Sequence, residues 1–292
     1  MTILITGAAG RTSGYVIERL LASSAQPDIR LLVRSQASAE KVRTRFPTLP
    51  QSAFVIGDFL ETHTLPPAVQ GVDIVFYNAP AFHPLESAMG IAMIEAAKES
   101  GVKHFVLCSV LFPLLTKLLN HIAKLSIEEH LIESGLNYTI LQPTSFMQNI
   151  NIMDTVTRSV LVAPYSPKVL QGFVDLRDLA DVTCKVLDNP SAHNRARYEL
   201  VSENSTLESV AGVIASVSGH SYIPIEHVPE KDVASRGLVP AQGYTAYSRE
   251  GLERMIYYYN SRGIPGNNNT MRWLLQREPT SWESFVRREL QG

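Results

Sequence analysis

The sequence predicts an α/β protein, built on a doubly wound parallel sheet with a smaller α+β part at its C-terminal end. Two observations support this prediction. Through the first two thirds of the 292 residues, short β-branched runs alternate with longer helical patterns, which is typical of βαβ units. The short runs are also almost continuously apolar, as strands covered by helices on both faces require.

The predicted strands follow one another at βαβ spacing and cover residues 2–6, 29–33, 54–56, 73–77, 105–107 and 138–141. Helical periodicity follows the first glycine turn and recurs across 91–97, where Gly101 is expected to end the helix. A further helix is expected over about 120–134, ended by Gly135. These elements place a large core in the first half of the chain.

Past residue 150 the regularity weakens. Residues 174–181 are expected to open a helix with an acidic first turn, and Ser205 or Thr206 to cap another. Two helices are expected in the tail, around the loop 263–269. We therefore expect a domain over 1–150, with 168–200 returning to the sheet, and a smaller C-terminal part over 151–292.

Composition and charge exclude several classes of protein. Lys and Arg number 26 against 28 Asp and Glu, so no broad cationic field is available to hold nucleic acid. No apolar run approaches the roughly 18 residues that a membrane helix needs, and no cluster of residues has the spacing of a metal site. Cys108 and Cys184 stand in apolar segments and are expected to be buried free thiols. The chain enters a strand pattern at once without a signal peptide, so we expect a cytoplasmic protein.

The strongest motif is the turn after the first strand, where residues 6–14 read TGAAGRTSG. Gly7 permits a tight turn, and Gly10 lets backbone amides approach a pyrophosphate at a helix N-terminus. Ser13 stands where the third glycine of a dinucleotide pattern would fall, and serine is small enough to keep helix and strand close. A glycine-rich turn without a ligand is the alternative. The predicted cofactor contacts here are Gly7, Ala9, Gly10, Arg11 and Thr12.

The end of the second predicted strand selects the dinucleotide. An NAD site places Asp or Glu there to accept hydrogen bonds from the ribose 2′-hydroxyl. This chain has Arg34, which cannot accept that bond but can bind a 2′-phosphate in bidentate fashion. Lys41 adds positive charge nearby in the sequence. The prediction is NADP(H) rather than NAD(H), with a solvated surface arginine as the alternative.

Several short segments together resemble a known family. They read TGAAGR at 6–11, LVR at 32–34, GDF at 57–59, VKHFV at 102–106 and LNYTILQPT at 136–144, with GIPG at 263–266 and WLLQREPT at 273–280 in the tail. This set resembles the NmrA-like group of atypical short-chain dehydrogenases. The resemblance implies a Rossmann NADP(H)-binding domain with a small C-terminal substrate domain. Members of the group include reductases of quinones, isoflavones and other aromatic compounds, and also regulators that bind dinucleotide without turnover.

The resemblance implies further cofactor contacts in three groups. Asp58 and Phe59 would flank the adenine, and the ribose side would be lined by Asn78, Ala79 and Pro80. The residues that would approach the nicotinamide are Pro143, Thr144, Ser145 and Phe146. Plain structural roles are open for some of these residues: Asp58 capping a turn and Pro143 ending a strand.

The catalytic residues depart from the usual pattern of short-chain dehydrogenases. Lys124 matches the family lysine of a K-x-x-x-E pattern, and Ser109 matches the substrate-orienting hydroxyl. Asn120, however, stands where the usual tyrosine would be. An amide cannot donate the proton that an alkoxide needs. The substitutes, in order of preference, are Lys124, His121 and Tyr165. An exposed i,i+4 pair of Lys124 with Glu128 is the structural alternative.

The apolar segment 110–116 lies between Ser109 and the helix of Lys124, which favours a pocket for a hydrophobic substrate. A helix-packing loop or an oligomer contact is an equal alternative. We therefore expect an NADPH-dependent oxidoreductase that reduces an aromatic or cyclic carbonyl or conjugated small molecule, as a monomer or homodimer. Two other readings stay open: an NADP(H)-sensing regulator without turnover, and a non-redox isomerase or dehydratase on the same fold.

Overall fold

A seven-stranded sheet organises the N-terminal part of the chain. The computed structural model describes residues 1–24, 27–233 and 245–291. The strand order is β10-β6-β5-β4-β1-β2-β3, and the pairs from β3 to β6 are parallel. The strands are β1 (Thr2–Ile5), β2 (Asp28–Val33), β3 (Phe54–Ile56), β4 (Ile74–Tyr77), β5 (His104–Cys108), β6 (Tyr138–Pro143) and β10 (Ala196–Leu200). The order from β3 to β6 is that of doubly wound dinucleotide-binding folds, so the predicted fold class is confirmed.

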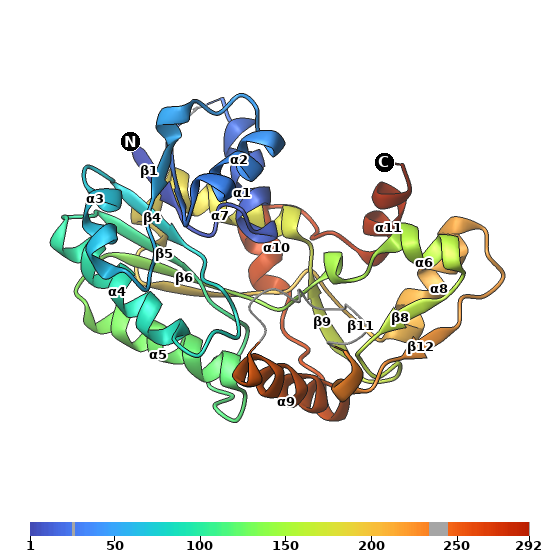
Figure 1. Cartoon of the computed structure of the whole chain (residues 1–292). Helices are drawn as coiled ribbons and strands as arrows, with labels where there is room; N and C mark the ends of the chain where they lie inside the picture. The colour runs from blue at the N-terminus through green and yellow to red at the C-terminus, as the bar shows by residue number, and fades with distance from the viewer. Residues whose placement is uncertain (25–26, 234–244, 292) are drawn as a thin grey trace. The chain divides into compact units, whose positions relative to one another are not determined.

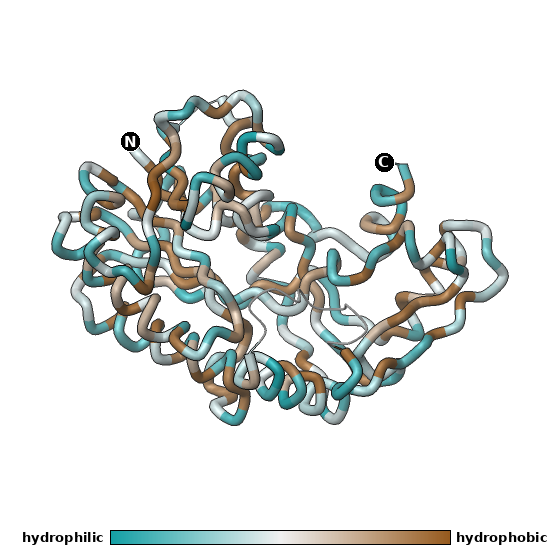
Figure 2. Tube along the Cα trace, in the orientation of Figure 1, coloured by the Kyte–Doolittle hydropathy of each residue, from teal (hydrophilic) through white to brown (hydrophobic). Residues whose placement is uncertain are grey.

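Helices cover both faces of this sheet. Figure 1 shows α1 (Arg11–Leu21), α2 (Gln36–Arg45) and α7 (Leu176–Asp188) on one face, and α3 (Leu65–Val69), α4 (Glu86–Glu99) and α5 (Leu119–Glu133) on the other. Successive strand residues point to opposite faces. In β1, the adjacent Ile3 and Leu4 are both 0% exposed, which is possible only because both faces are covered. Figure 2 shows the corresponding hydrophobic segments along the sheet.

The sequence located these elements closely. All six predicted strands are present, and no end differs from the prediction by more than two residues. The helix expected over about 120–134 is α5, and Gly101 and Gly135 follow α4 and α5 with φ of 73° and 82°. These left-handed values suit glycine and end the helices. The thiols of Cys108 and Cys184 are free and buried, as expected.

Two small sheets and five helices make up most of the C-terminal part. One sheet has the order β11-β9-β7 and the other pairs β12 with β8. The strands are β7 (Ser145–Phe146), β8 (Leu161–Ala163), β9 (Gln171–Val174), β11 (Glu203–Ser205) and β12 (Ile225–His227). The helices are α6 (Ile152–Arg158), α8 (Leu207–Ser218), α9 (Ala246–Arg262), α10 (Asn269–Leu275) and α11 (Trp282–Gln291). Short 3-10 helices cover Gln51–Ala53, Thr62–Thr64, Met147–Asn149, Pro190–His193 and Glu230–Asp232.

The tail corrects one prediction. Three helices follow residue 245 where two were expected, because α10 ends at Leu275, before the left-handed Gln276 with φ of 57°, and α11 begins only at Trp282. Another boundary also moves: Val174 closes β9, so the helix expected from residue 174 begins at Leu176. The capping prediction is confirmed, since the side chain of Thr206 accepts a hydrogen bond from the backbone N–H of Ser209.

The described chain divides into two compact units. The first comprises Met1–Thr116, His121–Gln142 and Leu179–Tyr198; the second comprises Lys117–Asn120, Pro143–Asp178 and Glu199–Gly292. The larger sheet, apart from the ends of β6 and β10, belongs to the first unit. In the second unit the Trp282 ring packs edge-on against Phe173 and Phe285, which anchors α11 to β9. Within 1–24, 27–233 and 245–291, no helix has the length and apolar character to span a membrane.

Candidate active site

The turn between β1 and α1 has the shape that a pyrophosphate site needs. Gly7 has φ of 59°, and a Cβ at this position would stand 2.7 Å from the carbonyl oxygen of Asn78. The N–H of Gly10 donates to the carbonyl of Gly7 at 2.8 Å, and Gly10 caps α1 without any side-chain hydrogen bond. The first amides of a helix have no partner within the helix and favour an anion. The glycines and the helix end therefore fit a dinucleotide phosphate.

Ser13 performs a structural task that a third glycine could not. Its hydroxyl is buried and donates to the Thr6 carbonyl at 2.8 Å, which ties the start of α1 back to β1. The same oxygen accepts from Asn78 Nδ2 at 3.1 Å. The backbone N–H of Asn78 in turn donates to Thr6 Oγ1 at 2.9 Å. The carboxyl ends of β1 and β4 are thus locked together beneath the turn, where the strand order reverses.

The other residues expected at the turn face solvent to different degrees. Ala9 and Arg11 are exposed and Thr12 is half-buried. Arg34 follows β2 and is exposed, and its guanidinium has no ion pair or hydrogen bond with any residue in the described ranges. It is therefore available for an anion. One guanidinium near the turn was missed by the sequence analysis: Arg45, at the end of α2, packs directly over Gly14, a close approach that a side chain at Gly14 would block.

The residues expected at the adenine and ribose make local contacts. Oδ1 of Asp58 accepts from the N–H of Leu60 at 3.0 Å, so this carboxylate caps a turn. The Phe59 ring packs edge-on against Tyr77 with centroids 5.4 Å apart. Ala79 and Pro80 follow Asn78 after β4, with Ala79 half-buried and Pro80 exposed. These positions lie at the carboxyl ends of β3 and β4, the same edge of the sheet as the glycine turn.

Lys124 is buried, and its ion-pair partner is a residue that the sequence analysis missed. Its Nζ lies 3.1 Å from Oε1 of Glu86, and the two side chains are 7% and 1% exposed. An exposed pair of Lys124 with Glu128 is therefore wrong. Glu86 opens α4, and a carboxylate two residues before the apolar run at residues 88–94 was the available signal. Burial raises the pKa of Glu86, against the opposing effect of the Lys124 charge.

Glu128 makes a second buried carboxylate on α5. Ser109 Oγ donates to its Oε1 at 2.5 Å, and Gln142 Nε2 donates to both oxygens at 2.9 and 3.0 Å. Burial raises the pKa of Glu128, opposed by the hydrogen bonds from Gln142 and Ser109. Because Ser109 has one proton and gives it to Glu128, its hydroxyl is left as an acceptor toward any further group.

His121 is fully buried rather than accessible at the rim of a site. Its Nδ1 lies 2.9 Å from the Phe112 carbonyl, and because a carbonyl only accepts, Nδ1 carries the hydrogen. Burial lowers the pKa of His121. A lowered pKa disfavours the charged imidazolium that would donate a proton, which weakens His121 as the acid. Phe112 itself has φ of 54°, and Phe82 has φ of 61°, both unusual for residues other than glycine.

Five sequence-predicted residues belong to the second unit. Pro143 closes β6, Thr144 Oγ1 donates to the Gly172 carbonyl at 3.0 Å, and Ser145 and Phe146 form β7. Tyr165 is buried, its ring lies 6.1 Å from that of Tyr259, and burial raises its pKa. A phenol with a raised pKa stays neutral at pH 7 and can still donate a hydrogen bond.

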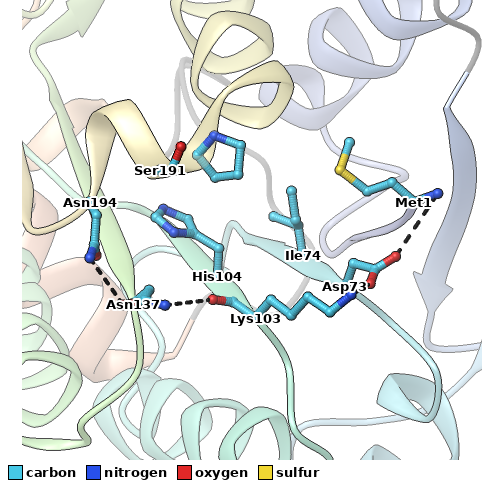
Figure 3. Close-up of a pocket in the computed structure, with 9 residues that line it drawn as sticks. Met1, Asp73, Ile74, Lys103, His104, Asn137, Ser191 and Asn194 are labelled. Atoms are coloured by element: carbon cyan, nitrogen blue, oxygen red, sulfur yellow. Dashed lines mark hydrogen bonds and ion pairs between the residues drawn. The ribbon is translucent and has the colours of Figure 1, made fainter.

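A pocket of about 550 Å³ opens at the opposite edge of the larger sheet. Its lining includes Asp73, Lys103, His104 and Asn137, which stand where β4, β5 and β6 begin. Figure 3 shows Asn137 donating to the Lys103 carbonyl, and the Nζ of Lys103 lies 2.6 Å from Asp73, so three of these polar residues are already paired with one another. None of the residues predicted from the sequence lines this pocket. Among the described residues there is also no group of three or more His, Cys, Asp or Glu that could hold a metal.

Comparisons with known proteins agree with this architecture. The NAD(P)H azoreductase of Xenophilus azovorans is 32% identical over 230 residues, which cover 77% of this chain and 76% of the relative. The structure of an NADPH-dependent quinone oxidoreductase of Escherichia coli complexed with NADPH has a TM-score of 0.79 at 22% identity, over 99% of this chain and 100% of that one. The structure of NmrA, a negative transcriptional regulator, in complex with NAD has a TM-score of 0.75 at 18% identity, over 98% of this chain and 94% of that one.

The two structural likenesses establish a shared fold. The family itself is established by a match that spans nearly the whole sequence. The model of the NmrA-like family matches residues 1–286, which include the first compact unit, all but the last six residues of the second, and all the site residues described above. The resemblance drawn from short sequence segments is confirmed, and this chain belongs to the NmrA-like family.

Proposed function

We propose that this protein is an NADPH-dependent oxidoreductase that reduces a hydrophobic, conjugated aromatic or cyclic compound, with Lys124 acting in place of the usual tyrosine–lysine pair. The observation that carries the proposal is a buried, charge-paired lysine at the same sheet edge as a glycine turn built for a dinucleotide. Lysine is expensive to bury, and buried titratable groups in such positions are typical of catalytic sites.

The names of the relatives support the redox class. An azoreductase and a quinone oxidoreductase both act on conjugated compounds that take up two electrons, and both carry a nicotinamide cofactor in their names. The expectation of an oxidoreductase using NADP(H) agrees with them. Azo compounds and quinones are accordingly the first substrates that we propose to test.

The chain's own residues would hold the cofactor at its phosphates. The amides after Gly7 and Gly10 would bind the pyrophosphate, and the free guanidinium of Arg34 would bind the 2′-phosphate. When bound, a reduced nicotinamide supplies a hydride to the substrate. Lys124 would then stabilise the negative charge that develops on the substrate heteroatom and give it a proton. Its amine would recover that proton from water.

Turnover of NADPH tests the proposal. Absorbance of the reduced nicotinamide would be followed with the purified protein and a panel of quinones, azo dyes, enones and aromatic ketones. Lys124→Met should bind NADPH within about twofold of the unaltered protein while kcat falls about 100-fold, the size typical of losing a general acid. Lys98→Met, which removes an exposed lysine from α4, is the control. Unchanged turnover in Lys124→Met would remove Lys124 from the mechanism.

A regulator without turnover is the second candidate. Two observations favour it: Asn120 occupies the usual tyrosine position, and a negative transcriptional regulator has the same fold. Tight binding of NADPH by calorimetry, with no consumption across the whole substrate panel, would support this candidate over the reductase. Product formation without loss of nicotinamide absorbance would instead point to a non-redox enzyme.

A further inference from the structure

We propose that Glu86 is a positioning residue for Lys124, which it keeps charged and holds at one place at the carboxyl edge of the larger sheet. This inference rests on the proposed function only where it concerns turnover, because the pairing itself can be measured without substrate. No role for Glu86 follows from the sequence motifs.

One oxygen of Glu86 accepts a hydrogen bond, and the other, Oε1, is buried without a hydrogen-bond donor, so the charge of Lys124 is its partner. Oε1 lies 3.1 Å from Lys124 Nζ, and Oε2 accepts from the backbone N–H of Phe82 at 3.1 Å. Phe82 has φ of 61°, an unfavourable value that surrounding contacts must maintain. Glu86 thus connects the loop after β4 to the lysine on α5.

Close packing of two helices brings the pair together. A Cβ on Gly90, one turn after Glu86 in α4, would stand 2.6 Å from the side chain of Ile127 in α5. Ser87 Oγ also donates to the Ala123 carbonyl at 3.3 Å. The absence of a side chain at Gly90 therefore lets α4 approach α5 closely enough for an ion pair between buried side chains.

Other titratable groups surround the pair. Tyr77 and His83 interact electrostatically with Glu86, Cys108 and Glu128 with Lys124, and Arg197 with Glu128. Glu128 is bound by Ser109 and Gln142. In the part of the chain that the structure describes, Glu86 is the carboxylate within ion-pair distance of Lys124.

The consequence concerns the protonation of Lys124. An opposite charge within about 4–6 Å raises the pKa of a lysine by about 1–3 units, whereas burial without a counter-ion lowers it. Replacing the carboxylate by an amide removes the first effect and leaves the second. Lys124 in Glu86→Gln should therefore lose its proton at a lower pH than in the unaltered protein, and the alkaline limb of the kcat profile should move with it.

The experiment measures the lysine directly. The protein is labelled with 13C at lysine Cε, the Lys124 signal is identified by its absence in Lys124→Met, and its pH midpoint is followed by NMR without ligand. Glu86→Gln should lower this midpoint by about 1 pH unit or more. NADPH affinity should change less than about twofold. The alkaline limb of the kcat profile should move to lower pH by the same number of pH units as the Lys124 midpoint.

A matched control uses the same two helices. Glu95 of α4 contacts His130 of α5 at 2.7 Å and is 42% exposed, so Glu95→Gln removes an equivalent α4–α5 contact away from Lys124. It should leave the midpoint unchanged. If Glu86→Gln does not fold, Glu86→Asp, which keeps the charge but retracts it by one methylene, should lower the midpoint by a smaller amount.

Two results would overturn the proposal: a midpoint in Glu86→Gln within about 0.3 pH unit of the unaltered protein, or an unchanged midpoint in Glu86→Asp where only that variant folds. Failure of the proposed function looks different. In that case Lys124→Met retains turnover, or no substrate is reduced, while the Lys124 midpoint still responds to Glu86→Gln.

Discussion

Ser13 and Asn78 are joined by a hydrogen bond of 3.1 Å from Nδ2 to Oγ, at the place where a glycine-rich dinucleotide turn departs from its usual pattern. The serine also donates to the Thr6 carbonyl. A substitution that looks like a defect in the motif is thus a cross-link between the first helix and two strands. The consequence is that the turn is held by side chains as well as by glycine geometry.

Ser13→Ala should therefore lower the free energy of unfolding by about 1–3 kcal/mol, because it leaves the buried Thr6 carbonyl and Asn78 amide without a partner. Urea denaturation at pH 7 measures this change. Ser52→Ala, at an exposed position, is the control and should differ from the unaltered protein by less than about 0.5 kcal/mol. Equal stability of the two variants would contradict the cross-link.

Arg34→Gln should reduce NADPH affinity about 10- to 100-fold and leave NADH affinity almost unchanged. The reason is that a charged hydrogen-bonded contact contributes about 1.5–3 kcal/mol, and only NADPH has the 2′-phosphate. Calorimetric titration with both nucleotides measures the ratio. Arg30→Gln removes an arginine from the other end of β2, where it binds two backbone carbonyls, and should preserve the preference. Equal or tighter binding of NADH by the unaltered protein would remove the role of Arg34.

Asp175 should make the second unit sensitive to acid. It is 0% exposed, and Arg288 binds its carboxylate with Nη1–Oδ2 at 2.6 Å and Nη2–Oδ1 at 3.2 Å. Burial acts to raise the pKa of Asp175, but Arg288 and other donors outweigh it and the pKa is lowered. A lowered carboxyl pKa contributes stability above the unfolded value of about 3.9, and this contribution is lost as pH falls through the folded pKa.

Asp175→Asn should accordingly be less stable by about 2–4 kcal/mol at pH 7, since the partly buried guanidinium of Arg288 loses its buried partner and is left with the more exposed Glu289. The difference from the unaltered protein should shrink below about pH 4. Denaturant titrations at pH 7, 5 and 3 measure it. Asp154→Asn, which breaks an exposed i,i+4 pair with Arg158, should cost less than about 0.5 kcal/mol. A pH-independent difference for Asp175→Asn would contradict the assignment.

His104 should reduce stability at mildly acidic pH. It is 3% exposed, its Nε2 lies 2.9 Å from Thr139 Oγ1, and burial lowers its pKa to about 4, aided by the neighbouring His193. Below about pH 6.5 the unfolded chain therefore binds a proton that the folded chain does not. The free energy of unfolding should fall by about 3 kcal/mol between pH 6.5 and 4 through this residue.

His104→Gln should lose that part of the pH dependence, measured as the slope of stability between pH 7 and 4. His63→Gln, which removes a histidine with a 78% exposed side chain, should keep the slope of the unaltered protein. The same slope in His104→Gln and the unaltered protein would show that His104 is not held neutral by the fold.

The positions of the strands and of the glycine turn follow from local sequence. The strands of the larger sheet are apolar runs whose period and length are visible without a structure, and Gly7 and Gly10 mark the turn because few other residues can adopt its backbone. The position of Arg34 follows as well, since it directly succeeds a strand. Helical periodicity did not separate α10 from α11 in the tail, because both helices are short and the break between them depends on one left-handed residue, Gln276.

The sequence by itself therefore determined the fold class, the strand edges and the family. Only the tertiary structure decided what Lys124 pairs with. Helical spacing suggested Glu128, four residues along the same helix, but the contact is with Glu86, 38 positions earlier and on another helix. The physical reason is that periodicity reports which residues share a face of one element, whereas the approach of two helices depends on the volume of side chains between them, here the hydrogen of Gly90 against Ile127.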